Sequence, residues 1–112
     1  MEFQTPDSII QTLEQIRRES AKGVEALYAA EEVMVRSQLD YDLAFAKALL
    51  NAKGTVADKE ALALLATADL KLVAELAKAS VNRIKTKLKV LSEQQMSVQT
   101  QARMVELAWR VS

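Results

Sequence analysis

The sequence predicts an all-α protein built as a long antiparallel helical hairpin of the coiled-coil type. Half of the 112 residues are hydrophobic but only 4% are aromatic, a balance that favours helices over strands. One proline and two glycines leave few helix breakers. Apolar residues also recur at alternating steps of four and three, the spacing of a coiled-coil seam. We expect one domain over residues 1–112, since this is a common domain length.

The first helix is predicted over about residues 6–52. Thr5 can cap its N-terminus, Pro6 suits the first helical position, and Asp7 places a negative charge in the first turn. The predicted seam of this helix follows at steps of four and three: Ile9, Leu13, Ile16, Ser20, Gly23, Leu27, Ala30, Met34, Ser37, Tyr41, Ala44 and Ala48.

Gly23 is the one position where this helix could break. A glycine inside a helix costs about 1 kcal/mol relative to alanine, which a long packed helix can absorb. Because neither proline nor a cluster of turn residues lies nearby, a continuous helix is favoured. The alternative is a break at Lys22–Gly23, giving three helices.

The hinge of the predicted hairpin is the segment Lys53–Asp58. Gly54 can take the left-handed conformation that ends a helix. Thr55 is a predicted N-cap, and Asp58 three residues later completes an acidic form of the capping box.

The second helix is predicted over about residues 56–110. Its first part carries two adjoining apolar faces, one with Leu62, Leu65, Ala66, Val73 and Leu76, the other with Ala63, Leu70, Ala74 and Ala77. Two faces imply two neighbours. The rest narrows to a single seam: Val81, Ile84, Leu88, Leu91, Gln95, Val98, Ala102, Val105 and Trp109.

Near the hinge both helices carry more apolar surface than one hairpin can bury. Exposing all of it would exceed the few hundred Å² that monomers usually tolerate. We therefore expect a homodimer whose hinge-proximal halves form a four-helix bundle. The expected interface comprises Leu39, Leu43, Leu50, Leu62, Leu65, Leu72 and Leu76.

The composition argues against an enzyme. Histidine and cysteine are both absent, which removes the usual general base, the common nucleophilic triads and thiolate metal sites. Two glycines cannot form a phosphate-binding loop. The pair Asp40 and Asp42 lies about 200° apart on a helix, so it forms no carboxylate dyad. We expect no catalytic residue, no metal and no cofactor.

Two further features indicate an intracellular protein without a membrane partner. The start, Met1–Gln4, lacks the basic and apolar regions of a signal peptide. Nor does any apolar run approach the roughly 18 residues that a transmembrane helix needs.

The most visible local bias is a basic run formed by Arg83, Lys85, Lys87 and Lys89. Residues 81–112 hold six cations and two acids, a net charge of +4, whereas residues 1–53 hold six cations and nine acids, a net charge of −3. The favoured interpretation is that these cations flank the seam and pair with acids of the first helix, near Glu19 and Glu25. The alternative is contact with nucleic-acid phosphates.

Trp109 is the single tryptophan and lies at the far end from the hinge. If the two helices align, it comes beside Phe3 and closes the open end of the hairpin. An exposed tryptophan there would instead be a candidate anchor for a partner.

Residues 41–112 resemble a group of small alanine-rich helical proteins of tailed bacteriophages and prophages. The marks of the resemblance are Tyr41, Gly54-Thr55, the run Ala61-Leu-Ala-x-Leu-Ala-Thr67, and Gln99-x-Gln-x-Arg103. The group has no assigned activity, and its genes often lie among phage recombination and replication functions. The resemblance implies a bacterial cytoplasm and a role during phage growth or lysogeny, with no functional residue to carry over.

These observations predict a non-enzymatic, homo-oligomeric protein–protein interaction module that also binds another protein, as an accessory in phage DNA recombination or replication. Two alternatives remain open. One is a DNA-binding accessory that uses residues 83–89. The other is an inhibitor of a host enzyme or defence system.

Overall fold

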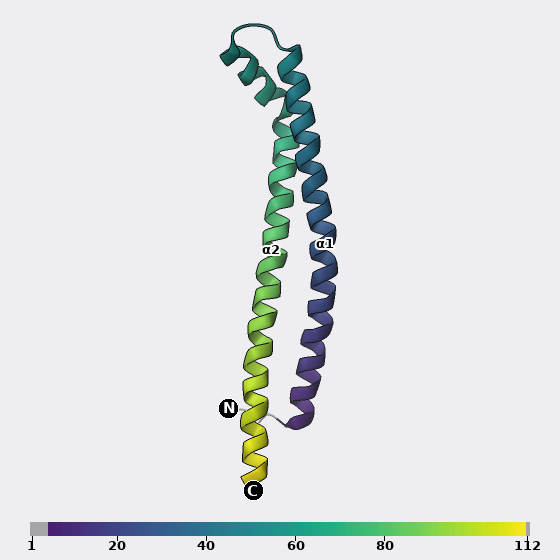
Figure 1. The fold of residues 1–112 in the computed structure, drawn as a ribbon, viewed down its shortest axis with the longest axis vertical. Helices are drawn as coiled ribbons and strands as arrows, with labels where there is room; N and C mark the ends of the chain where they lie inside the picture. The colour runs from purple at the N-terminus through teal and green to yellow at the C-terminus, as the bar shows by residue number, and fades with distance from the viewer. Residues whose placement is uncertain (1–4, 112) are drawn as a thin grey trace. The chain divides into compact units, whose positions relative to one another are not determined.

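The computed structural model describes residues 5–111 as two helices packed into an antiparallel hairpin (Figure 1). Helix α1 spans Pro6–Asn51 and helix α2 spans Val56–Val111. Both predicted helices are confirmed to within one residue at each end. Helix α1 continues through Gly23, so the three-helix alternative is wrong.

Helix α1 begins with a reciprocal cap between Thr5 and Ser8. The Ser8 N–H donates to Thr5 Oγ1 at 3.1 Å, and the Thr5 N–H donates to Ser8 Oγ at 3.0 Å. The carbonyl of Thr5 accepts from the Ile9 N–H at 3.0 Å. The predicted N-cap is confirmed, and Ser8 plays the part that glutamate usually plays in a capping box.

The hinge is built as the sequence predicts. Gly54 has a φ of +121°, a conformation that side chains with a Cβ rarely adopt. The Asp58 N–H donates to Thr55 Oγ1 at 3.2 Å, and the Thr55 N–H donates to Asp58 Oδ2 at 3.3 Å. Asn51 ends α1 and Val56 begins α2, so four residues reverse the chain.

Within the hairpin the chain forms two compact units, each described by itself below. Unit 1 comprises Met1–Ala26 and Ile84–Ser112, of which residues 5–26 and 84–111 are described; unit 2 is Leu27–Arg83 and contains the hinge.

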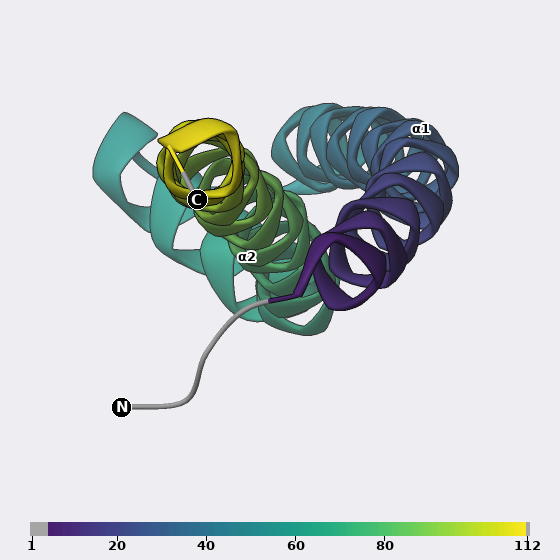
Figure 2. The same cartoon turned by 90° about the horizontal axis from the view of Figure 1, so that it is seen from below.

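Unit 1 is held together by large apolar side chains of the predicted seams. Ile9, Ile16 and Leu91 are buried. Gly23 lies against Leu88, because a Cβ built on Gly23 would fall 2.6 Å from Leu88 Cδ2. Figure 2 views this unit from its end, with the first turns of α1 in purple and the last turns of α2 in yellow. A bare glycine thus makes room for a leucine of the facing helix.

Unit 2 has a seam made mostly of small side chains. Its buried residues are Ser37, Ala63, Thr67, Ala74, Ala77 and Val81. Thr67 satisfies its hydroxyl by donating to the Ala63 carbonyl at 2.7 Å. Of the two apolar faces predicted near the start of α2, the alanine-rich face therefore packs against α1.

Candidate interaction surface

The seven leucines predicted as an oligomer interface all lie exposed on unit 2. Their exposed fractions run from 50% at Leu62 to 85% at Leu50. A large apolar side chain must be exposed in the single chain if it is to contact a partner, but its exposure does not identify that partner. Whether these residues form an interface stays a prediction.

Apart from Leu62, which follows the exposed Glu60, each of these leucines lies two residues after a position on the side of its helix that faces the other one. Leu39 follows Ser37, for example, and Leu65 follows Ala63. Two residues are about 200° around a helix, so these leucines point away from the other helix of the hairpin. The seam and the leucines therefore occupy nearly opposite sides of each helix.

Two outer faces result, one on each helix of unit 2. The outer face of α1 consists of Leu39, Leu43, Ala46 and Leu50. The outer face of α2 consists of Leu62, Leu65, Asp69, Leu72 and Leu76. Both follow the three-and-four spacing of a helix-packing seam, and Asp69 is the one charged residue among these nine positions.

A hollow of about 310 Å³ borders the outer face of α1 in unit 2. Apolar side chains and the stems of polar ones form most of its wall. The residues that line it are Met34, Val35, Gln38, Leu39, Asp42 and Lys78. A side chain of an apolar partner could enter here, beside Leu39.

The hinge residues shape the turn between the two helices and form no binding or catalytic site. Gly54, Thr55 and Asp58 are exposed, and the two hydrogen bonds between Thr55 and Asp58 cap α2. They fix where the chain turns and thus which residues of α1 face α2.

The basic run is exposed along α2. Ile84 and Leu88 between its members are half-buried, whereas Arg83, Lys85, Lys87 and Lys89 are open to solvent. The described residues form ion pairs at Glu32–Arg36, Glu75–Lys78 and Glu106–Arg110, each within one helix. Within residues 5–111 the four cations therefore flank the seam, but none pairs with Glu19 or Glu25.

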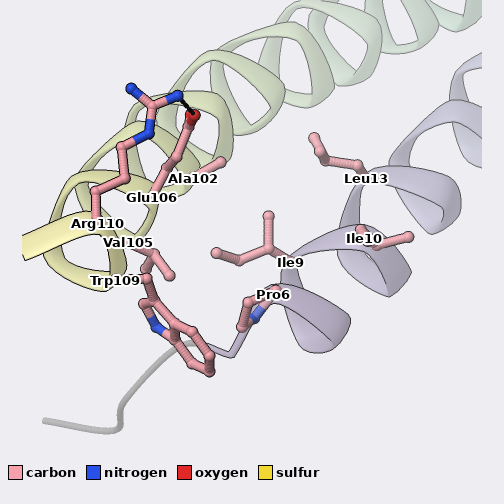
Figure 3. Close-up of a pocket in the computed structure, with 9 residues that line it drawn as sticks. All are labelled: Pro6, Ile9, Ile10, Leu13, Ala102, Val105, Glu106, Trp109 and Arg110. Atoms are coloured by element: carbon pink, nitrogen blue, oxygen red, sulfur yellow. Dashed lines mark hydrogen bonds and ion pairs between the residues drawn. The ribbon is translucent and has the colours of Figure 1, made fainter. Parts of the chain in front are cut away.

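Trp109 lines a hollow of about 460 Å³ in unit 1 (Figure 3). Its side chain is 66% exposed. Arg110 donates to Glu106 at 2.6 Å beside the hollow. The other lining residues are Pro6, Ile9, Ile10, Leu13, Ala102 and Val105. Phe3, the predicted neighbour of Trp109, lies outside the described residues.

Sequence reasoning missed the two hollows and the partner of Thr5. Ser8 occupies the position of a capping box where glutamate or glutamine is usual, so a broader motif that includes serine would have found it. For the hollow of unit 1 the sequence signal is Ile10, an apolar residue next to the seam residue Ile9 but off the seam; the structure leaves it 54% exposed beside the hollow.

Over the part of the chain that the structure describes, no three acidic side chains gather as a metal site would require. Neither helix, within the same residues, has a stretch long and apolar enough to cross a bilayer. No protein-family model, curated protein or solved structure matches this chain. Its function is therefore inferred from its own surfaces.

Proposed function

We propose that this protein is a non-enzymatic helical interaction module, and that the outer faces of unit 2 are its working surface. One observation carries the proposal: small residues form the seam between α1 and α2, while seven leucines stay exposed on the outer sides. Apolar faces with this spacing bind other helices by the same packing that joins helices within a bundle.

The resemblance of residues 41–112 to phage helical proteins supports an accessory role. On this proposal the protein acts in the cytoplasm of a bacterial host, beside the proteins of phage DNA recombination or replication. An interaction module suits such a role because it can join two partners without chemistry of its own.

The proposal is tested by capture from lysates of phage-infected bacteria. The immobilised wild type is compared with a Leu43→Asp/Leu65→Asp variant, which places a charge on each outer face. We expect recombination or replication proteins, or the chain itself, to be retained by the wild type and lost by the variant, because a buried unpaired carboxylate opposes association.

A matched control is Tyr28→Asp/Val56→Asp. These two residues are exposed by 67% and 74%, belong to unit 2, and lie outside the outer faces. The control should retain the same partners as the wild type. Equal losses in both variants would show that the outer faces have no special role.

A second candidate function is contact with nucleic-acid phosphates by the basic run. It is favoured by the exposure of Arg83, Lys85, Lys87 and Lys89 and by their lack of an ion-pair partner within residues 5–111. Free cations on a helix can bind phosphates and release counterions. The overall net charge of zero gives this candidate less support.

A further inference from the structure

We infer that further copies of this chain cover the outer faces of unit 2, with α1 of one protomer packed antiparallel on α2 of the next copy. This rests on the proposed function, because it names a partner for the same surface. Three observations lead to it: the matching spacing of the two faces, the position of their single charge, and the amount of apolar surface left exposed.

The spacing of the two outer faces matches when one of them is reversed. Leu39, Leu43, Ala46 and Leu50 follow one another at steps of four, three and four. On α2 the same steps separate Leu65, Asp69, Leu72 and Leu76. Antiparallel packing therefore forms four layers, written with the α1 residue first: Leu39 with Leu76, Leu43 with Leu72, Ala46 with Asp69, and Leu50 with Leu65.

The charged residue of the α2 face selects this pairing over the pairing of α2 with itself. If two α2 faces met, antiparallel alignment would set Asp69 against Leu72 in two layers. A carboxylate buried against leucine without a partner is costly. Against α1, Asp69 meets the small Ala46, and the exposed Lys47 follows directly. A lysine stem can pass beside an apolar contact and bring its ammonium group to the carboxylate.

The exposed apolar surface is larger than a single copy usually leaves in water. The seven leucines are each at least half exposed. At on the order of 100 Å² each they present about 700 Å² in all, more than the few hundred Å² that monomers usually leave exposed. Pairing α1 with itself would cover one outer face and leave the larger α2 face in water.

The inference is tested first by cross-linking, which this chain suits because it has no native cysteine. Leu43→Cys and Leu72→Cys chains are mixed and oxidised. We expect the mixed 43–72 disulfide to form in preference to either like pair, because the proposed layer holds these positions together. Leu62→Cys is the matched control: it is exposed on the same face but lies ten positions, or about 15 Å, along α2, and should join Leu43→Cys poorly.

Charge exchange provides a second test that needs no cross-link. Asp69→Lys should weaken self-association in sedimentation equilibrium by about tenfold or more, because it brings two ammonium groups together. Adding Lys47→Asp to the same chain should restore association. Recovery in the double variant also excludes misfolding as the cause of the loss.

Several outcomes would overturn the inference. These are a monomer at all concentrations tested, preferential 43–43 or 72–72 disulfides, cross-linking to position 62 as readily as to position 72, and failure of Lys47→Asp to restore association. A monomer that still captures another protein through Leu43 and Leu65 would show that the captured protein, and not a further copy of the chain, covers the outer faces; the proposed function would still stand.

Discussion

At the scale of single residues, the two glycines have different physical roles. Gly54 supplies a backbone conformation: its φ is +121°, and a Cβ there would lie 3.0 Å from Asp58 Cβ. Gly54→Val should lower the free energy of unfolding by more than about 1 kcal/mol, since a β-branched residue is strained at positive φ. Thermal or urea unfolding measures this loss.

The control for Gly54→Val is Lys53→Val. Lys53 is exposed and lies next to Gly54 in the hinge, but it is not held at positive φ. The same valine should cost much less stability there. Equal losses at the two positions would mean that β-branching in the hinge, rather than the backbone of Gly54, causes the effect.

Gly23 supplies space instead. In the wild type, Gly23→Ala gains about 1 kcal/mol of helix propensity, but its methyl group must displace Leu88 Cδ2, which would lie 2.6 Å away. We expect the two effects to offset each other. In a Leu88→Ala background the obstacle is gone, so the same change should stabilise the protein by about 1 kcal/mol.

A double-mutant cycle of Gly23→Ala and Leu88→Ala, followed by urea unfolding, measures this coupling. The interaction energy should exceed about 0.5 kcal/mol, as is usual for residues in contact. If Gly23→Ala stabilises both backgrounds equally, Leu88 does not depend on the space that the glycine leaves.

At the scale of the helices, the sequence predicted the ends well because local chemistry determines them. Thr5 and Pro6 mark one helix start, and Gly54, Thr55 and Asp58 mark the hinge. These signals act over three or four residues and need no tertiary information. All twelve predicted seam residues of α1 are buried or half-buried in the structure, since the steps of four and three repeat without interruption.

The packing of α2 near the hinge could not be predicted in the same way. The alanine-rich face and the leucine-rich face have the same periodicity, so spacing alone does not tell which one meets α1. Nor can periodicity distinguish a face covered by the same chain from one left for a partner. In the structure Ala63, Ala74 and Ala77 are buried, while Leu65 and Leu76 are exposed.

The basic run gives a prediction at this scale. Lys85→Gln/Lys89→Gln should change the free energy of unfolding by less than about 1 kcal/mol, because exposed charges contribute little and neither lysine pairs with an acid within residues 5–111. If the outer faces of unit 2 are the working surface, the same double variant should also self-associate like the wild type. Thermal unfolding and sedimentation equilibrium check the two statements.

A salt titration of DNA binding completes that comparison. For an interaction module without nucleic-acid contacts, neither wild type nor variant should bind DNA at physiological salt. Submicromolar binding by the wild type that falls steeply with salt, and that the double variant loses on every sequence alike, would favour the phosphate-binding candidate instead.

At the scale of the whole molecule, the two units differ in the size of the side chains that are buried between α1 and α2. The seam of unit 1 includes Ile9, Ile16 and Leu91, whereas that of unit 2 is built mostly of alanine, serine and threonine. Burial of large apolar side chains is the main favourable term in folding. A single copy should therefore hold unit 2 less firmly than unit 1, and further copies packed on its outer faces should make up the difference.

Amide hydrogen exchange can separate the two units in one experiment. Association stabilises whichever part it buries, in proportion to the concentration of the partner, and local opening reports stability segment by segment. Protection of residues 27–83 should therefore rise with protein concentration, while protection of residues 5–26 and 84–111 changes little. In Leu43→Asp/Leu65→Asp the concentration dependence should vanish. If protection instead rises equally in both units, the copies meet over the whole hairpin, and the leucines of unit 2 are not the surface that joins them.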